Sequence, residues 1–140
     1  MLNDLKRNKT LLLLFLSVIV IIILYGKFRC VYTNYVDPLE IDVDFHIDGW
    51  SISHYVLFTI IGYNFPKSFF FAMFMGVLWE IIEHMIGAFK PSILNGITNC
   101  NRKSTKESSS DTAGYWWYGK KEDIVVNFLG FITGHFIYCY

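Results

Sequence analysis

The sequence predicts an all-α fold, a polytopic membrane helix bundle of about four transmembrane helices. Hydrophobic residues make up 54% of the 140 residues and charged residues only 17%, and the mean hydropathy is +0.38. A soluble domain typically carries about 25% charged residues. Four apolar stretches follow one another along the chain, and the chain length leaves room for a single folded domain.

Charge and cysteine content exclude several protein classes. The 12 basic and 12 acidic residues give a net charge of zero, so no basic excess indicates a nucleic-acid partner. The cysteines, Cys30, Cys100 and Cys139, form no C-x-x-C pair, so neither a zinc site nor a redox motif is predicted. Either all of them are free thiols, which is the simplest expectation, or Cys30 and Cys100 pair in an oxidising compartment.

The first apolar stretch, residues 10–25, reads TLLLLFLSVIVIIILY and contains no charge. With its flanks it approaches the roughly 20 residues that a span needs. The basic residues Lys6, Arg7 and Lys9 precede it, so a cleaved signal peptide is the alternative. No small-residue cleavage site follows, which favours an anchor helix. We therefore expect a tail and anchor over residues 1–30 and a three-helix membrane domain over residues 31–140.

An acidic connection, residues 37–48, leads to the next apolar stretch. Pro38 prevents a helix there, while the alternation of acidic and apolar residues permits a short strand without an evident partner. We expect a solvated loop here rather than a metal site. The second apolar stretch, residues 50–65, is short for a span, and His54 lies one turn inside its start.

The third stretch, residues 68–89, contains the sequence WEIIEH and therefore places Glu80, Glu83 and His84 inside a candidate span. Carboxylates in such a position cost a few kcal/mol each, by order of magnitude, and are by default candidate site residues. His84, like His135 further on, is expected to be structural.

A polar loop of low complexity, residues 90–122, separates the third stretch from the fourth. The fourth stretch, residues 124–140, begins directly after Asp123. At helical spacing Asp123, Asn127, Gly130 and Gly134 form one narrow stripe. The two glycines would allow close helix packing, and the polar pair would then face the carboxylates of the third span.

Connectivity predicts that the polar residues gather at one membrane face. Successive spans alternate in direction, so the start of the second span, the end of the third and the start of the fourth share a face. His54, Glu80, Glu83, Asp123 and Asn127 all lie near these points. This conclusion holds for either orientation of the chain in the membrane.

The expected chemistry of this face follows from its side chains. Carboxylates with an amide oxygen are hard ligands that suit Ca²⁺ or Mg²⁺, and a nearby histidine is a natural general base. Glu80, Glu83 and Asp123 are thus candidate metal ligands, and His54 is a candidate base. The alternative is structural, with the three carboxylates paired to lysines at the interface, namely Lys90, Lys120 and Lys121.

Three segments carry a family resemblance over residues 45–140: HIDGWSISHYVLFTIIGY, LWEIIEH and EDIVVNFLGFITG. They resemble small bacterial inner-membrane proteins related to the VanZ-like family, which show an acid on one helix and D-x-x-x-N-x-x-G-x-x-x-G on the next. They are also similar to the eukaryotic phosphatidylserine synthases, which act by base exchange. In those the signature is a histidine, then W-E-x-x-E, then an aromatic W-W segment, here Trp116-Trp117, before an aspartate-led helix.

The resemblance implies a role for each matched residue. Glu80, Glu83 and Asp123 would hold Ca²⁺ near a phospholipid phosphate, Asn127 would be a ligand or a phosphate contact, and His54 would be the base. The implied function is lipid head-group chemistry. The alternative is a non-enzymatic membrane protein, an assembly or resistance factor, whose polar cluster only packs the helices.

Membrane lipids are the expected partners. The sequence leaves open whether the chain forms a homo-oligomer. We expect a multi-pass integral membrane protein, but two charge signals conflict over its orientation. The basic N-terminal tail favours a cytoplasmic N-terminus, whereas the overall lysine and arginine bias favours a cytoplasmic site face.

Overall fold

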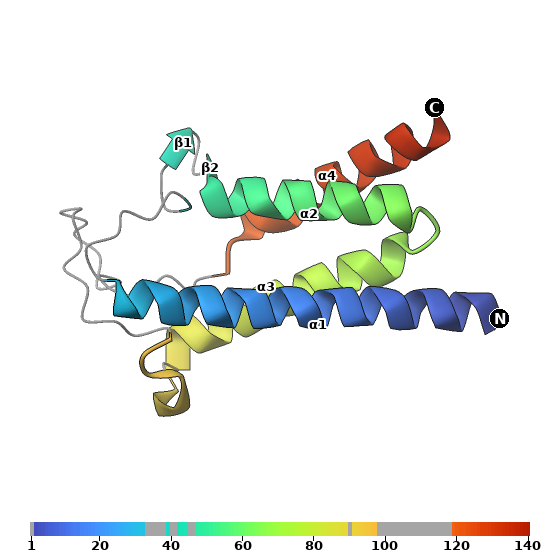
Figure 1. The fold of residues 1–140 in the computed structure, drawn as a ribbon. Coiled ribbons are helices and arrows are strands. Elements are labelled where there is room, and N and C mark those ends of the chain that lie inside the picture. The colour runs from blue at the N-terminus through green and yellow to red at the C-terminus, as the bar shows by residue number, and fades with distance from the viewer. Residues whose placement is uncertain (1, 33–38, 40–41, 45–46, 90, 98–118) are drawn as a thin grey trace.

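The structure is a computed structural model, and it describes residues 2–32, 39, 42–44, 47–89, 91–97 and 119–140. Four α-helices dominate it (Figure 1): α1 (Leu2–Val31), α2 (Gly49–Asn64), α3 (Phe69–Phe89) and α4 (Lys121–Cys139). A short 3₁₀ helix, η2 (Ser92–Leu94), follows α3, and two short strands, β1 (Asp42–Asp44) and β2 (Ile47–Asp48), precede α2. The all-α prediction is confirmed at this level.

Two of these helices are long and apolar enough to cross a membrane, namely Leu5–Val31 within α1 and Phe69–Phe89. Only 17% of the most apolar window of each is buried inside the protein. The core helix of a soluble protein would be mostly buried, and large exposed apolar surfaces mark contact with lipid or a partner. The low burial of these two apolar helices weakly supports membrane association.

The helix boundaries agree with the apolar stretches except at two helix starts and one helix end. α2 and α3 match residues 50–65 and 68–89 to within one residue. α1 extends beyond residues 10–25 at both ends, because leucine, lysine and arginine flanks are good helix formers that a hydropathy window leaves out. α4 begins at Lys121, three residues before residue 124, for the same reason.

The acidic connection contains the short strand that its alternation permits, and a partner for it. β1 pairs antiparallel with β2, with Asp42 opposite Asp48 and Asp44 opposite Ile47. This tight pairing returns the chain directly to the first residue of α2. The backbone at Asp48 is therefore fixed on both sides, by a strand before it and a helix after it.

Glycines bring α2 and α4 into backbone contact. A Cβ atom on Gly134 would overlap the carbonyl oxygen of Thr59, and one on Gly130 would lie 2.5 Å from that of Tyr55. Gly62 on α2 makes the reciprocal contact with the carbonyl of Phe131. Close packing through small residues is thus present as predicted, but the helix that α4 approaches most closely is α2 and not α3.

The chain alternates direction along the bundle, so four helix ends meet at one end of the molecule (Figure 1). These are the end of α1, the start of α2, the end of α3 and the start of α4. The N- and C-termini lie at the other end. There Arg7 on α1 donates a hydrogen bond from Nε to Oγ of Ser68, just before α3, at 2.8 Å.

Cysteine chemistry differs between the two ends. Cys30, near the end of α1, is disulfide-bonded, and Cys139, near the end of α4, is an exposed free thiol. The expectation that all three cysteines are free thiols is therefore wrong for Cys30. The other predicted partner, Cys100, lies outside the described residues.

Candidate functional site

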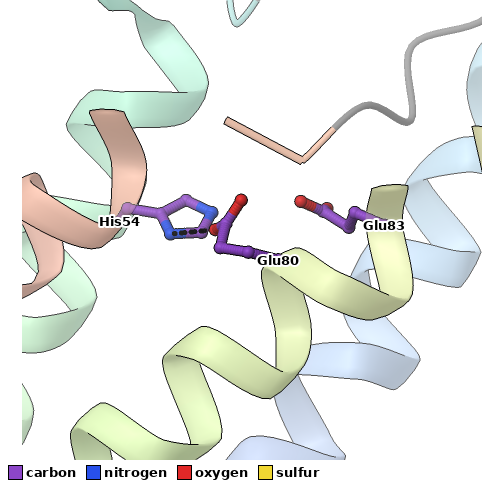
Figure 2. A group of neighbouring side chains, drawn as sticks. All are labelled: His54, Glu80 and Glu83. Carbon is purple, nitrogen blue, oxygen red and sulfur yellow. Dashed lines mark ion pairs between the residues drawn. The ribbon is translucent and has the colours of Figure 1, made fainter. Parts of the chain in front are cut away.

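Three side chains from two helices converge at the end of the bundle where the polar residues were predicted to gather. His54 lies in the second turn of α2, and Glu80 and Glu83 lie one turn apart on α3. One ligand atom from each lies within 4.8 Å of the other two. Figure 2 shows the imidazole and both carboxylates turned toward one another. We call this group the His54–Glu80–Glu83 cluster.

Glu80 is the most deeply buried member of the cluster, with 5% of its surface exposed. Its Oε2 accepts a hydrogen bond from the backbone N–H of Lys120 at 2.9 Å. Its Oε1 is buried and accepts no hydrogen bond from any described residue, although Nδ1 of His54 lies 3.6 Å away. Burying a carboxylate oxygen without a hydrogen-bond donor costs free energy. We therefore expect a cation or a proton beside this atom.

His54 is oriented by Asn127 of α4. Its Nδ1 lies 3.0 Å from Oδ1 of Asn127, and the second neighbour of Nδ1 is Oε1 of Glu80. Both neighbours are acceptors, so Nδ1 carries the proton and donates it to Asn127. In the neutral ring Nε2 then keeps its lone pair, which is the form that binds a metal ion or accepts a proton.

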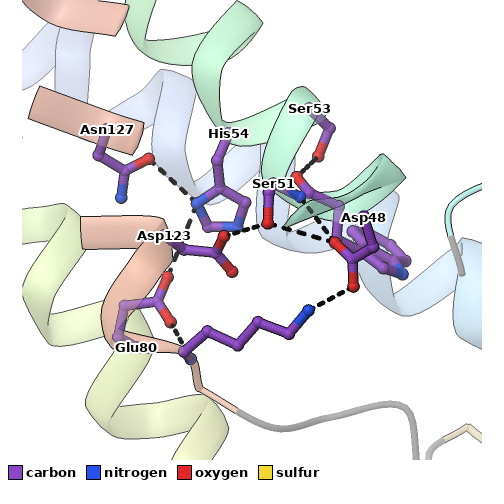
Figure 3. Close-up of polar contacts among 9 residues, drawn as sticks. Asp48, Ser51, Ser53, His54, Glu80, Asp123 and Asn127 are labelled. Atoms are coloured by element: carbon purple, nitrogen blue, oxygen red, sulfur yellow. Dashed lines mark hydrogen bonds and ion pairs between the residues drawn. The ribbon is translucent and has the colours of Figure 1, made fainter. Parts of the chain in front are cut away.

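A second polar network lies beside the cluster (Figure 3). Oδ1 of Asp48 accepts a hydrogen bond from the backbone N–H of Ser51 at 3.0 Å and caps α2. The Ser51 hydroxyl lies between two carboxylates, and its single proton is donated to Oδ1 of Asp123. The Lys120 ammonium forms an ion pair with Oδ2 of Asp48. This network therefore ties the start of α2 to the start of α4.

Lys120 links the network to the cluster. Its ammonium group is bound to Asp48, while its backbone N–H is bound to Glu80. The preceding Gly119 lies against the α3 backbone, where a Cβ atom would overlap the carbonyl oxygen of Glu80. Only a residue without a side chain permits this close approach.

Asp48, Ser51 and Lys120 were not among the predicted site residues. The expectation that the acidic connection is solvated is wrong for Asp48, which is 2% exposed. Its position just before the second apolar stretch is a typical N-cap signal, which could have revealed the cap but not the burial. The structural alternative paired the site carboxylates with lysines such as Lys120, and the ammonium group of Lys120 forms an ion pair with Asp48.

The predicted metal ligands are not all brought to one point. Glu80 and Glu83 converge with His54, whereas Asp123 is buried beside them and accepts a hydrogen bond from Ser51. Asn127 is fully buried and contacts His54 rather than a carboxylate. Lys90 and the Trp116-Trp117 segment lie outside the described residues.

The two other histidines that the structure describes stand apart from this group. His84 is exposed on α3, and Nε2 of His135 lies 3.8 Å from Sγ of Cys139 on the last turns of α4. Neither belongs to a metal-binding group among the described residues.

Comparison with protein-family models, with curated proteins and with solved structures gives no match for this chain. The functional argument therefore depends on the geometry of the site.

Proposed function

We propose that this chain is a multi-pass membrane protein that binds a divalent cation at the His54–Glu80–Glu83 cluster and, through the cation, the phosphate of a membrane lipid. The observation that carries the proposal is the buried Oε1 of Glu80, which accepts no hydrogen bond from any described residue. This oxygen faces the ring of His54, and the second carboxylate of the cluster, that of Glu83, lies nearby. A cation held by the two carboxylates, with Nε2 of His54 as the nitrogen ligand, would supply this oxygen with a partner and offset the repulsion between the carboxylates.

In this proposal all four helices lie in the membrane. α2 has 16 residues and α4 has 19, which at 1.5 Å per residue gives about 24 and 28 Å. The hydrocarbon core is about 30 Å thick, so α4 is close to a full span and α2 is somewhat short. Both carry large exposed apolar side chains, such as Ile60 at 50% and Phe136 at 56% exposed.

The donor set bears on which cation is bound. Two carboxylates suit Ca²⁺ or Mg²⁺, as expected from the sequence. An imidazole nitrogen in the same group is a ligand that Mn²⁺ or Zn²⁺ accepts more readily. A titration with these ions in turn therefore tests the original expectation of Ca²⁺ or Mg²⁺ against the wider set.

Lipid head-group exchange is the chemistry that this arrangement would support. A cation on Glu80 and Glu83 would bind the phosphate and make its phosphorus more electrophilic. If Nε2 of His54 is not a ligand, it would take the proton from the attacking hydroxyl and return it to the oxygen of the departing head-group alcohol as the old P–O bond breaks. The resemblance to the phosphatidylserine synthases implies the same roles, and that to the VanZ-like proteins implies a shared helix arrangement.

A second candidate function is non-enzymatic, and a specific observation favours it. Asp48 and Asp123 are both satisfied by side chains of the protein, Lys120 and Ser51. A polar network of this kind holds the starts of α2 and α4 together without any ligand. In that case the protein would be a structural, assembly or resistance factor.

Thermal unfolding of the purified full-length protein in detergent separates the two candidates. We expect millimolar Ca²⁺, Mg²⁺, Mn²⁺ or micromolar Zn²⁺ to raise the unfolding temperature, since a ligand that binds only the folded state stabilises it. Glu80→Gln with Glu83→Gln should abolish the gain. Glu122→Gln, on the first turn of α4 and outside the cluster, is the matched control. A wild-type protein that no ion stabilises would exclude the cation and leave the structural role.

A further inference from the structure

A cavity of about 320 Å³ lies between α1, α2 and α3. Its walls are mainly apolar side chains of all three helices, among them Phe15, Ile22, Leu57, Met75, Trp79 and Ile82. This volume is at the lower end of the range for small-molecule sites, roughly 300–1,000 Å³. Apolar lining of this kind excludes a polar metabolite as the occupant and suits a hydrocarbon chain.

The cavity has a polar side, and that side is the candidate site. His54, Glu83 and Asn127 all contribute to its lining. Two of them belong to the His54–Glu80–Glu83 cluster. A molecule in the cavity would thus have its apolar part between the helices and its polar part beside the cluster, as an amphiphile requires.

Asn127 supplies a hydrogen-bond donor to this cavity. Its side chain is fully buried, its Oδ1 is held by His54, and its Nδ2 has no partner among the described residues. Figure 3 shows the amide with its oxygen toward His54 and its nitrogen turned away. A buried amide N–H without an acceptor is rare and costly, so an acceptor from a bound molecule would complete the site.

Gly76 lets α3 approach this donor closely. A Cβ atom on Gly76 would lie 3.1 Å from Nδ2 of Asn127 and 2.8 Å from Cζ of Phe58. Gly76, Phe58 and Asn127 all line the cavity. The missing side chain therefore lets the α3 backbone pass close to Nδ2, which is buried at the wall of the cavity.

We propose that this cavity binds one acyl chain of a membrane lipid, and that the chain's ester carbonyl accepts a hydrogen bond from Nδ2 of Asn127. The head group would then lie at the His54–Glu80–Glu83 cluster. Placement of the head group rests on the proposed function, whereas chain binding needs no cation. Experiments can therefore refute chain binding and the placement of the head group separately.

Photo-crosslinking of the full-length protein in dodecyl maltoside tests chain binding. The probe is a phosphatidylcholine with a diazirine in one acyl chain, used at low mole fraction with EDTA present, and cross-links are mapped by mass spectrometry. We expect cross-links at Met75 and Trp79 and none above background at Val20, which is 54% exposed on the outer face of α1. Cross-links spread over exposed faces and absent from the cavity would overturn the proposal.

Two variants test the cavity itself. Gly76→Leu should remove most of the cross-linking at Trp79, because a side chain at this position would displace Phe58 and Asn127, which line the cavity. Val77→Leu, on the next residue and outside the lining, is the matched control. Ile82→Phe fills the cavity from a position further along α3 and replaces Gly76→Leu in the test if that variant does not fold. A folded cavity-filling variant that cross-links like the wild type would contradict the proposal.

Competition between unlabelled lipids and the probe tests the hydrogen bond to the ester carbonyl. Unlabelled diacyl phosphatidylcholine should compete about fivefold better than the diether lipid of equal chain length, the difference expected for one neutral hydrogen bond. The preference should vanish in Asn127→Leu. Equal competition by both lipids in the wild type, or stronger competition by an isoprenyl phosphate, would overturn the acyl assignment. Loss of cation binding with cross-linking intact would instead reject only the proposed function.

Discussion

The imidazole of His54 donates from Nδ1 to the amide oxygen of Asn127 across 3.0 Å, and this contact joins α2 to α4 inside the bundle. It fixes the ring so that Nε2 is the free nitrogen. It also fixes the amide at the cavity wall, with Nδ2 buried and without a partner among the described residues. The orientation of both proposed binding groups thus depends on one hydrogen bond.

Replacing Asn127 by leucine should therefore destabilise the protein and release the ring. The side chain is fully buried, and loss of one partner of a buried hydrogen bond costs about 1–3 kcal/mol. Denaturant unfolding in micelles measures the free energy, and ¹⁵N chemical shifts of the histidine ring report the tautomer. Asn64→Ala, which removes only an exposed bond to the carbonyl of Ile60, should change neither quantity. Ring ¹⁵N shifts identical to those of the wild type in Asn127→Leu would contradict the positioning role.

The ion pair between Lys120 and Asp48 gives a second prediction. Asp48 is 2% exposed, and breaking a buried pair costs about 3–5 kcal/mol because one charge is left without a partner. Lys120→Met should thus be strongly destabilising. Asp48→Asn in the same chain should recover much of the loss, since asparagine keeps the N-cap and carries no charge. A double-mutant cycle measures the coupling, and additive effects of the two changes would show that the pair contributes little.

The glycine contact between α2 and α4 gives a third prediction. A side chain on Gly134 would overlap the backbone at Thr59, so Gly134→Leu should separate the helices and disrupt the His54–Asn127 contact as well. We expect a loss of at least a few kcal/mol, as for other strongly overpacked sites. Val125→Leu, at a position that is 58% exposed on the same helix, is the control. Equal unfolding temperatures for the two variants would contradict this packing.

The disulfide at Cys30 gives a prediction about orientation. Disulfides persist in oxidising compartments, and Cys30 lies at the end of the bundle that holds the site. The basic tail at the opposite end, Lys6, Arg7 and Lys9, agrees with a cytoplasmic N-terminus, whereas the overall lysine and arginine bias favours the reverse orientation. Because the disulfide agrees with the basic tail, we expect the site to face away from the cytoplasm.

Labelling of intact cells with a membrane-impermeant maleimide checks this orientation. The free thiol of Cys139 should resist the reagent until the membrane is permeabilised, because it lies at the end opposite to the site. A cysteine introduced at exposed Ile93, after α3, should react without permeabilisation. The reverse pattern would place the site in the cytoplasm.

The sequence predicted the arrangement of the helices better than the contacts within the site. Hydropathy located the apolar cores of all four helices, and alternation of direction placed His54, Glu80 and Asp123 at one end. Side-chain spacing could not say which helices touch. The glycines of α4 pack on α2, and this puts Asn127 beside His54 rather than beside the carboxylates.

The burial of Asp48 could not be seen from local composition. Its acidic neighbours indicate a solvated segment, but the strand pairing before it and the ion pair with Lys120 bury this one carboxylate. Lys120 is 72 residues away in sequence, and no periodic pattern connects the two. Contacts between distant loops of this kind depend on the tertiary fold.

Direct measurement of Mn²⁺ binding by electron paramagnetic resonance tests the central claim most closely. The purified wild-type chain should bind about one ion, and Glu122→Gln should bind it equally well. Glu80→Gln should weaken binding by at least tenfold, since even groups that only support a metal ligand contribute roughly 10–100-fold. A wild-type protein that binds no more Mn²⁺ than the variant with both Glu80→Gln and Glu83→Gln would contradict the account.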